Sequence, residues 1–213
     1  MKLRKLRYPL SKLSSTSLPI AHGAGACRVF LATSLCLVLV WAGGVTTPML
    51  NAQEDEETMA NREYRIKAAY LYQFGRYVEW PAKAFSDGNS PFVIGVLEQD
   101  PLVSDLEQIA KIKKIQDRPI QIRRFSSAAD IRACNILYLP ASLSSETQAE
   151  VIRKIAGQGI LLVGDANGFL NVGGVMQFAV EDNKIRVLIS RKAAEREGLT
   201  ISAKLLQVAR VVD

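Results

Sequence analysis

Three short apolar runs, separated by segments with helical patterns, constrain the fold of this chain more than any other feature of its sequence. The runs are FVIGVLE at 92–98, NILYLP at 135–140 and GILLVGD at 159–165. They have the length of strands, and the last of them, which is wholly apolar, is expected at the centre of the sheet. The alternation of strands and helices therefore predicts an α/β fold, a single domain with a mostly parallel sheet and helices on both faces.

The segments around these runs predict the remaining elements up to residue 157. A helix capped by Asn61 is expected to run to about Glu79, because the residue before Pro81 is pushed out of the α region. RPIQIRRF at 118–125 alternates apolar and polar residues, which is typical of a half-exposed strand. Three further helices are predicted: one opened by Asp100-Pro101, a short one over Ser126–Arg132, and one capped by Ser144 or Ser145 that ends at Gly157.

The rhythm of the sequence changes after residue 172. GGVMQFAVEDNKIRVLIS, from residue 173, predicts two strands around a reversal at Asp182-Asn183. LTISAKLLQVARVV, from residue 199, predicts one closing helix capped at Thr200 or Ser202. The C-terminal hairpin is therefore expected to add antiparallel strands at one edge of the sheet.

The positive charge of the chain is confined to its first 52 residues. The net charge is +6, but six of the 27 basic residues and none of the 21 acidic residues lie in residues 1–52, so residues 53–213 have no net charge. The phosphate-driven affinity of nucleic-acid binders then has no source, and no nucleic-acid partner is expected.

Residues 1–52 have the pattern of an export leader. A basic, Ser-rich start precedes the apolar run from Val29 to Val45, and small residues follow it. Leu50-Asn51-Ala52 is an acceptable cleavage site, and the alternative is a retained membrane anchor, since the apolar run is close to the minimum length for a bilayer. The predicted organisation is a signal peptide or anchor at 1–52, a flexible lead-in at 53–62 and one α/β domain at 63–213, exported under both interpretations.

Cysteine and histidine are nearly absent from the exported part. Cys27, Cys36 and His22 lie in the leader, and only Cys134 follows it. This composition excludes an intramolecular disulfide, a Cys/His zinc site and Ser-His-Asp or Cys-His catalysis in residues 53–213, and no cofactor or metal is expected. Cys134 is interpreted as a small buried residue, with a reactive thiol as the alternative.

The glycine-rich stretch VGDANGFLNVGG, at 163–174, matches neither the dinucleotide-binding spacing nor the P-loop spacing. Its glycines are interpreted as positions that permit positive φ. Asp165 stands at the carboxyl end of a strand, where open α/β sheets often bind ligands, and a loop or cap hydrogen bond is the alternative. Glu181 is interpreted as part of a solvated hairpin tip, and no two acids stand at the spacing of a glycosidase pair.

The helix expected at 61–79 is unusually aromatic. Its polar residues fall along one narrow stripe, and a helix that is apolar over most of its circumference is buried on more than one side. Tyrosines are favoured where one end stays in water, and tyrosine beside arginine suits a protein interface or a flat ring ligand. The tyrosines are Tyr64, Tyr70, Tyr72 and Tyr77, and the polar stripe comprises Arg62, Arg65, Gln73, Arg76 and Glu79.

Taken in order, these segments resemble the YfiR family of bacterial periplasmic proteins. The segments are KAAYLYQFGRYVEWP, FVIGVLEQDPL, CNILYLP, GILLVGD, GFLNVGGVMQF, NKIRVLIS and ISAKLLQVARVV, and the resemblance covers about residues 63–212. It implies a small α/β regulator in the periplasm and not an enzyme. Family members of this type bind the periplasmic sensor part of an inner-membrane diguanylate cyclase and hold it inactive, and their release raises cyclic di-GMP and promotes biofilm formation. The resemblance also implies self-association, with a homodimer as the expected form.

One departure from the family limits what the resemblance implies. The best-known form of the family carries paired cysteines that suggest redox control, whereas this chain keeps only Cys134 after its leader. Intramolecular redox switching is therefore not expected.

The main hypothesis is a periplasmic regulatory protein that occludes a membrane partner. Tyr70, Phe74, Arg76 and Tyr77 are the predicted partner contacts, on an exposed edge of the helix. Arg76, Asp165 and Arg186 are the predicted contacts for a small anionic or aromatic ligand, and the two arginines could hold an anionic group bidentately.

Two alternatives belong to other classes of protein. One is a hydrolase that uses Asp165 and Glu181, for which a cavity with two carboxylates would be needed. The other is a small-molecule carrier related to periplasmic binding proteins, for which two lobes about a hinge would be needed.

Overall fold

The computed structural model of the chain describes residues 50–212, and the side chains of residues 58–212. The described residues belong to one compact unit. The predicted signal peptide or anchor lies outside the described residues, apart from its last three. Within the described range, no helix combines the length and the apolar character that a membrane span requires.

The main element of the fold is an eight-stranded sheet with the order β10-β8-β7-β6-β5-β2-β4-β3. β4, β2, β5, β6 and β7 run parallel to one another, β8 is antiparallel to β7, β10 is parallel to β8, and β3 is antiparallel to β4. The strands are β2 (Phe92–Leu97), β3 (Lys114–Ile115), β4 (Arg118–Phe125), β5 (Ile136–Leu139), β6 (Leu161–Gly164), β7 (Met176–Glu181), β8 (Lys184–Ile189) and β10 (Arg210–Val211). The predicted α/β class, the mostly parallel sheet and the C-terminal hairpin near one edge are confirmed.

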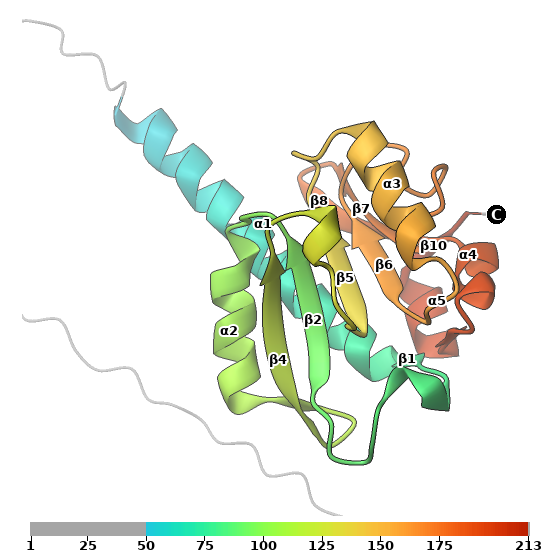
Figure 1. The fold of residues 1–213 in the computed structure, drawn as a ribbon. Coiled ribbons are helices and arrows are strands. Elements are labelled where there is room, and N and C mark those ends of the chain that lie inside the picture. Colours follow the sequence, from blue (N-terminus) through green and yellow to red (C-terminus); the bar gives the residue numbers. More distant parts are fainter. Residues whose placement is uncertain (1–49, 213) are drawn as a thin grey trace, which may run out of the picture. The chain divides into compact units, whose positions relative to one another are not determined.

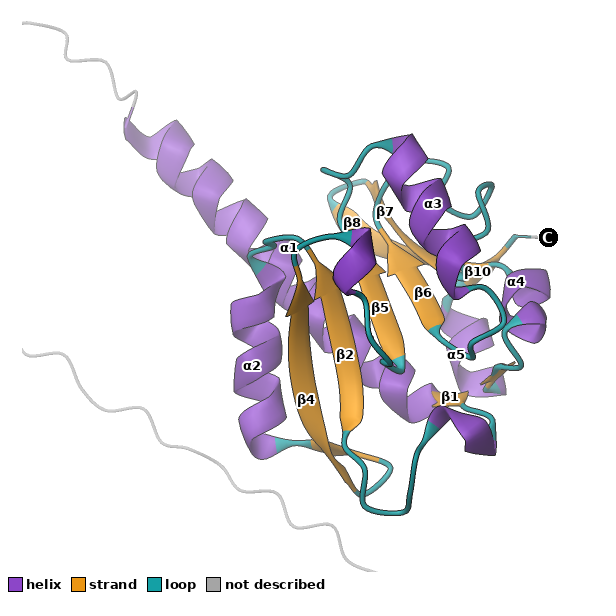
Figure 2. Cartoon of the chain, in the orientation of Figure 1, coloured by secondary structure: helices purple, strands orange, loops and turns teal. Residues whose placement is uncertain are grey.

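Helices cover both faces of this sheet. The long helix α1 crosses behind it and packs against α2, while α3 lies on the opposite face (Figure 1). The helices are α1 (Leu50–Tyr77), α2 (Leu102–Ile112), α3 (Ser145–Ile155), α4 (Arg191–Arg196) and α5 (Ala203–Val208), with 3-10 turns at Ala82–Ala84 and Ala128–Asp130. Figure 2 shows these helices and the strands between them in contrasting colours.

The three apolar runs form the centre of the sheet, and the central position predicted for GILLVGD is confirmed. Every residue of β2, β5 and β6 is buried, whereas β4, one strand further out, is buried only at Phe125. The hairpin between β7 and β8 reverses at Asp182 and Asn183, whose φ angles of 50° and 56° are those of a tight turn that matches the twist of the strands.

A second, two-stranded sheet joins distant parts of the chain. β1 (Val78–Glu79), which follows α1 directly, pairs antiparallel with β9 (Thr200–Ile201) near the C-terminus. The backbone N–H of Ser202 also donates to the carbonyl oxygen of Tyr77, over 2.9 Å. The end of α1 is therefore held by the last part of the chain.

The C-terminal segment differs most from its prediction. The single helix expected from residue 199 is wrong, because Thr200 and Ile201 form β9, the Ser202 side chain caps the short helix α5, and Arg210 begins an edge strand. Helix α4 was not predicted, since six residues are too few to show a helical period.

Three helix boundaries also differ from their predictions. α1 begins at Leu50 and not at Asn61, so the lead-in expected to be flexible at 53–62 is helical in the structure. The helix expected over Ser126–Arg132 is a 3-10 turn at Ala128–Asp130, and α3 ends at Ile155, just before Gly157 with its φ of 75°.

Candidate functional site

The exposed side of α1 presents an arginine between two tyrosines. The Arg76 side chain is exposed, and its guanidinium carbon lies 5.8 Å from the ring centroid of Tyr72 and 5.7 Å from that of Tyr77. Both rings are half-buried and pack against the core, so they provide a firm base for the cation. We call Tyr72, Arg76 and Tyr77 the Arg76 patch. No carboxylate of residues 58–212 forms an ion pair with Arg76.

Phe74 does not belong to an exposed edge, and its predicted exposure is wrong. Its side chain is 0% exposed, because it faces the sheet and stacks on Phe178 of β7 with the ring centroids 5.7 Å apart. Tyr70 is half-buried and lies 6.0 Å from both of these rings. Phe74 therefore holds α1 on the sheet, and only Tyr70, Arg76 and Tyr77 of the predicted contacts have accessible surface.

Arg186 does not converge with Arg76. Phe178 faces α1, and its cross-strand partner is Val187, which is 5% exposed. Successive side chains of a strand point to opposite faces, so the neighbouring Arg186 points away from α1. The two guanidinium groups lie on different sides of the sheet, and they do not hold one anionic group together.

Asp165, in contrast, is the centre of a polar cluster at the carboxyl ends of the central strands. Its Oδ2 atom accepts hydrogen bonds from the Lys67 ammonium group at 2.6 Å and from the Tyr138 hydroxyl at 2.7 Å. The same ammonium group lies 2.6 Å from Oε1 of Glu63, one turn earlier in α1. We call Glu63, Lys67, Tyr138 and Asp165 the Lys67 cluster. It ties α1 to β5 and to the end of β6.

Lys67 is the residue of this cluster that the sequence did not single out. Its side chain is 5% exposed, although it sits on a helix face among Ala and Leu residues. The sequence did contain a signal for Lys67, a lone lysine inside an apolar stretch. A buried ammonium group requires a carboxylate partner, so this pattern indicates an ion pair.

Lys67 and Tyr138, two members of the cluster, have shifted pKa values. Burial alone would lower the pKa of Lys67, but the hydrogen bonds and charges of Asp165 and Glu63 outweigh it, and the pKa of Lys67 is raised. Burial, and then the negative charge of Asp165, raises the pKa of the Tyr138 hydroxyl. Nearby Asp100 also has a raised pKa, chiefly because of burial. Lys67 is therefore cationic at neutral pH, and Tyr138 is a neutral hydrogen-bond donor.

One acceptor of the cluster is left over. The second carboxylate oxygen of Asp165, Oδ1, is buried and has no hydrogen-bond partner among the described residues. Asp165 directly follows β6, at the carboxyl end of the parallel strands, the type of position where open α/β sheets often bind ligands. This geometry suits Asp165 both as a structural link between α1 and the sheet and as a ligand contact.

Asp165 and Glu181 do not form a catalytic pair of carboxylates. The two oxygens of Glu181 accept hydrogen bonds from Arg210 at 2.8 and 2.6 Å. Asp165 contacts α1, whereas Glu181 lies on the strand face that also carries Gln177 and Ala179, away from α1. The carrier alternative also lacks its requirement, since residues 50–212, the part that the structure describes, form one unit and not two lobes.

The glycine-rich loop after β6 packs on its own phenylalanine. A side chain at Gly174 would lie 2.2 Å from the Phe169 ring, and one at Gly164 would lie 2.9 Å from it. Only Gly168 and Gly173 of this loop have positive φ angles, 78° and 109°. The sequence predicted the turn glycines, but it could not show that the other two make room for a ring.

Cys134 is buried at 8% exposure, which agrees with its interpretation as a small buried residue. Burial raises the pKa of its thiol to about 12, so the thiolate is scarce at neutral pH. Within residues 58–212, no group of three or more His, Cys, Asp and Glu side chains is arranged to hold a metal ion.

The fold and these sites define an α/β domain with a cation–aromatic surface on its first helix. A family described as YfiR/HmsC-like matches residues 64–210. The chain therefore belongs to the YfiR/HmsC-like family, and the resemblance seen in the sequence is confirmed. No curated protein matches the chain.

Two solved structures have a limited likeness to the chain. A conserved domain protein from Vibrio cholerae O1 biovar El Tor is 15% identical, with a TM-score of 0.44, over 57% of this chain and 55% of that chain. An ABC domain in complex with L-Trp from Streptococcus pneumoniae is 13% identical, with a TM-score of 0.42, over 56% of this chain and 55% of that chain. The match thus spans little more than half of each structure, and at these TM-scores neither supports an argument about this chain.

Proposed function

We propose that this protein is a periplasmic repressor of an inner-membrane diguanylate cyclase. It binds the periplasmic sensor region of the cyclase and holds the enzyme inactive, and its release raises cyclic di-GMP and promotes biofilm formation. The observation that carries the proposal is membership of the YfiR/HmsC-like family over residues 64–210. The basic, apolar leader of residues 1–52 supports export to the periplasm.

The mechanism is a shift of the partner's conformational equilibrium. A binding protein stabilises whichever state of its partner it binds more tightly, so repression requires higher affinity for the inactive cyclase. The regulator needs no chemistry of its own for this role.

The Arg76 patch, together with Tyr70, is the proposed partner contact. Arginine and tyrosine, together with tryptophan, are enriched among the residues that dominate binding energy at protein interfaces. The Tyr72 and Tyr77 rings already hold the Arg76 guanidinium, so little side-chain freedom is lost when a partner binds. We further propose that the protein acts as a homodimer, as its family implies.

Small-ligand contacts remain part of the proposal at two separate places. Asp165 offers its buried Oδ1 at the carboxyl edge of the sheet, and Arg186 offers an exposed guanidinium on the face away from α1.

The test is retention of the cyclase by the immobilised full chain. Detergent extract of the native membranes is passed over the protein, and retained proteins are identified by mass spectrometry. The expected result is recovery of a membrane diguanylate cyclase, with recovery reduced about tenfold by Arg76→Ala, as expected for the loss of a hot-spot arginine.

Arg65→Ala is the matched control, because Arg65 is another exposed arginine of α1, with a side chain 76% exposed and only a 3.9 Å contact to Asp105. It should leave retention unchanged. Absence of any cyclase from the retained fraction contradicts the proposed function, and equal loss in the two variants contradicts the proposed contact.

A further inference from the structure

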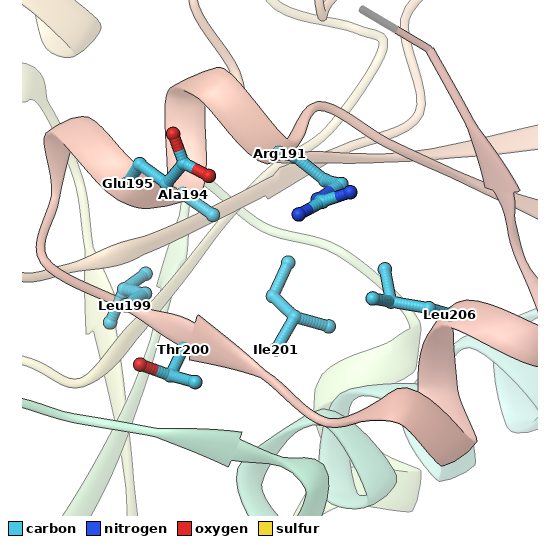
Figure 3. A pocket seen from close by; sticks show the side chains of 7 residues that line it. All are labelled: Arg191, Ala194, Glu195, Leu199, Thr200, Ile201 and Leu206. Carbon is cyan, nitrogen blue, oxygen red and sulfur yellow. The ribbon is translucent and has the colours of Figure 1, made fainter.

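A cavity of about 200 Å³ lies between α4, β9 and α5, outside the sites described above. Its wall is mainly aliphatic: Ala194 and Leu199 are buried, and Ile201 and Leu206 are half-buried and pack against the core. The lining residues are Arg191, Ala194, Glu195, Leu199, Thr200, Ile201 and Leu206 (Figure 3).

The cavity carries one cationic group without a partner. Figure 3 shows the Arg191 guanidinium over Ile201, with Leu206 beside it. Arg191 makes no hydrogen bond or ion pair with the side chains of residues 58–212, although Glu195 follows it one turn later on the same helix. Its five N–H donors therefore remain available at the mouth of an aliphatic hollow.

We propose that this cavity binds a small monoanionic carboxylate with a compact aliphatic body. The planar guanidinium fork matches a carboxylate in two parallel hydrogen bonds. Ligand sites typically combine an apolar wall with a few polar groups that fix orientation, and this wall has that composition. The lining contains no aromatic ring, so it favours an aliphatic body over a flat ring.

Glu195 limits the net negative charge that the ligand can carry. Its carboxylate also lines the cavity and opposes any anion, but it opposes a ligand with two negative charges more strongly than a ligand with one, which the Arg191 cation can offset. Phosphate and dicarboxylates are therefore disfavoured relative to a monocarboxylate.

Because the cavity borders β9, ligand binding can be followed through the backbone amides of β9 and β1. Ile201, which forms part of its wall, pairs with Val78 directly after α1, and Thr200 pairs with Glu79. A ligand seated against Ile201 is expected to change the amide environment of β9 first and of β1 next.

The experiment is an NMR titration of the full chain with hexanoate, and with hexan-1-ol as its neutral analogue. Hexanoate is expected to shift the amides of Ala194, Leu199 and Ile201, and to bind about tenfold or more tightly than the alcohol, because hydrogen bonds to charged groups are the stronger kind. Arg191→Gln should weaken hexanoate binding to the level of the alcohol.

Lys192→Gln is the matched control, since Lys192 is an exposed cation of the same helix that does not line this cavity. It should leave the hexanoate affinity within about twofold, a difference small on the scale of a lost charged hydrogen bond. Both substitutions are at exposed positions, and circular dichroism verifies their fold. Three results would each overturn the proposal: shifts confined to other residues, equal binding by Arg191→Gln, or equal or tighter binding of inorganic phosphate at these amides.

Discussion

At the scale of single residues, Lys67 is a buried cation that depends on its two carboxylate neighbours. Its ammonium group lies 2.6 Å from both Glu63 and Asp165, in a region where burial alone would favour the neutral amine. Removing one member of such a group leaves the opposite charge buried without compensation.

Lys67→Met is therefore expected to destabilise the domain strongly, by about 3–5 kcal/mol. The double variant Lys67→Met/Asp165→Asn removes the stranded charge as well and should regain part of the loss. Urea unfolding followed by circular dichroism measures both. The cost of Asp165→Asn is also measured in the wild-type background. If Asp165→Asn cost as much stability in the Lys67→Met background as in the wild type, Lys67 and Asp165 would not be coupled.

Asp100 gives a pH-dependent prediction. Burial raises its pKa, the charge of Asp165 adds to this, and the Leu102 amide and Lys67 act against it. A carboxyl with a raised folded-state pKa contributes stability that is present below its unfolded pKa and is lost as the pH rises through the folded pKa. Asp100→Asn should therefore be more stable than the wild type at pH 7, and the gain should vanish below the ordinary aspartate pKa of about 4.

A comparison with Asp100→Ala separates the effect of the Asp100 charge from the effect of its hydrogen bond to the start of α2. The Oδ1 atom of Asp100 accepts a hydrogen bond from the Leu102 amide at 2.9 Å, and an asparagine side chain preserves that acceptor. Asp100→Ala loses it and should be less stable than the amide variant by about 1 kcal/mol. Melting temperatures measured from pH 3 to pH 8 test both statements, and a wild type more stable than Asp100→Asn at pH 7 contradicts the first.

At the scale of elements, the sequence predicted best the elements that show a clear local residue pattern. β2, β5 and β6 were recognisable because both of their faces are apolar, and the hairpin was recognisable from Asp182-Asn183. The C-terminal segment was mispredicted because Thr200 and Ile201 are extended only through their pairing with β1, and no local pattern of residues reports so distant a partner.

The candidate site was predictable to a similar degree. The position of Asp165 followed from the end of a strand, and the exposure of Arg76 followed from the polar stripe of α1. Phe74 was misplaced because a helix that is apolar on most sides does not show which side meets the sheet. Lys67 was missed since its partner Asp165 is 98 residues away along the chain.

Helix α1 has a structural side and a surface side, which two substitutions should separate. Leu71 is 0% exposed, so Leu71→Ala should cost about 2–5 kcal/mol of stability. Arg76→Ala should change the stability by less than about 0.5 kcal/mol while it weakens cyclase retention. Thermal melts and the retention assay measure the two effects, and an unfolded Arg76→Ala protein would make Arg76 a structural residue.

The loop between β6 and β7 offers a prediction about space. Gly174→Ala places a methyl group against the Phe169 ring and should cost about 1–3 kcal/mol. Phe169→Leu in the same chain should relieve the clash, so the double variant should lose less than the sum of the single losses. Gly88→Ala, where nothing lies within 4 Å, is the control expected to leave urea unfolding unchanged. Strict additivity of the two changes would show that Phe169 does not fill this space.

At the scale of the whole molecule, the last residues complete the domain. β9 holds the end of α1, Leu205 of α5 is 4% exposed, and β10 covers the edge of β8. Deleting residues 200–213 is therefore expected to lower the stability of the entire domain in one cooperative transition, by about 3 kcal/mol or more, comparable to removing a large core side chain.

Deleting only residues 210–213 removes β10 alone and should have a smaller effect. Chemical unfolding followed by tryptophan fluorescence and by circular dichroism compares the two deletions. An unchanged midpoint after removal of residues 200–213 would mean that the C-terminal segment is an independent appendage.

The pairing of β1 with β9 also sets an order of events in folding. Glu79 and Thr200 meet only after nearly the whole domain has been brought between them, and closing so long a loop is entropically costly until other contacts shorten it. When the chain emerges N-terminus first, as in translation or in export through a membrane, the end of α1 lacks its last hydrogen-bond partners until β9 has emerged. The tyrosine and arginine surface at that end is therefore finished late, and a nascent or truncated chain is not ready to bind when its first helix has formed.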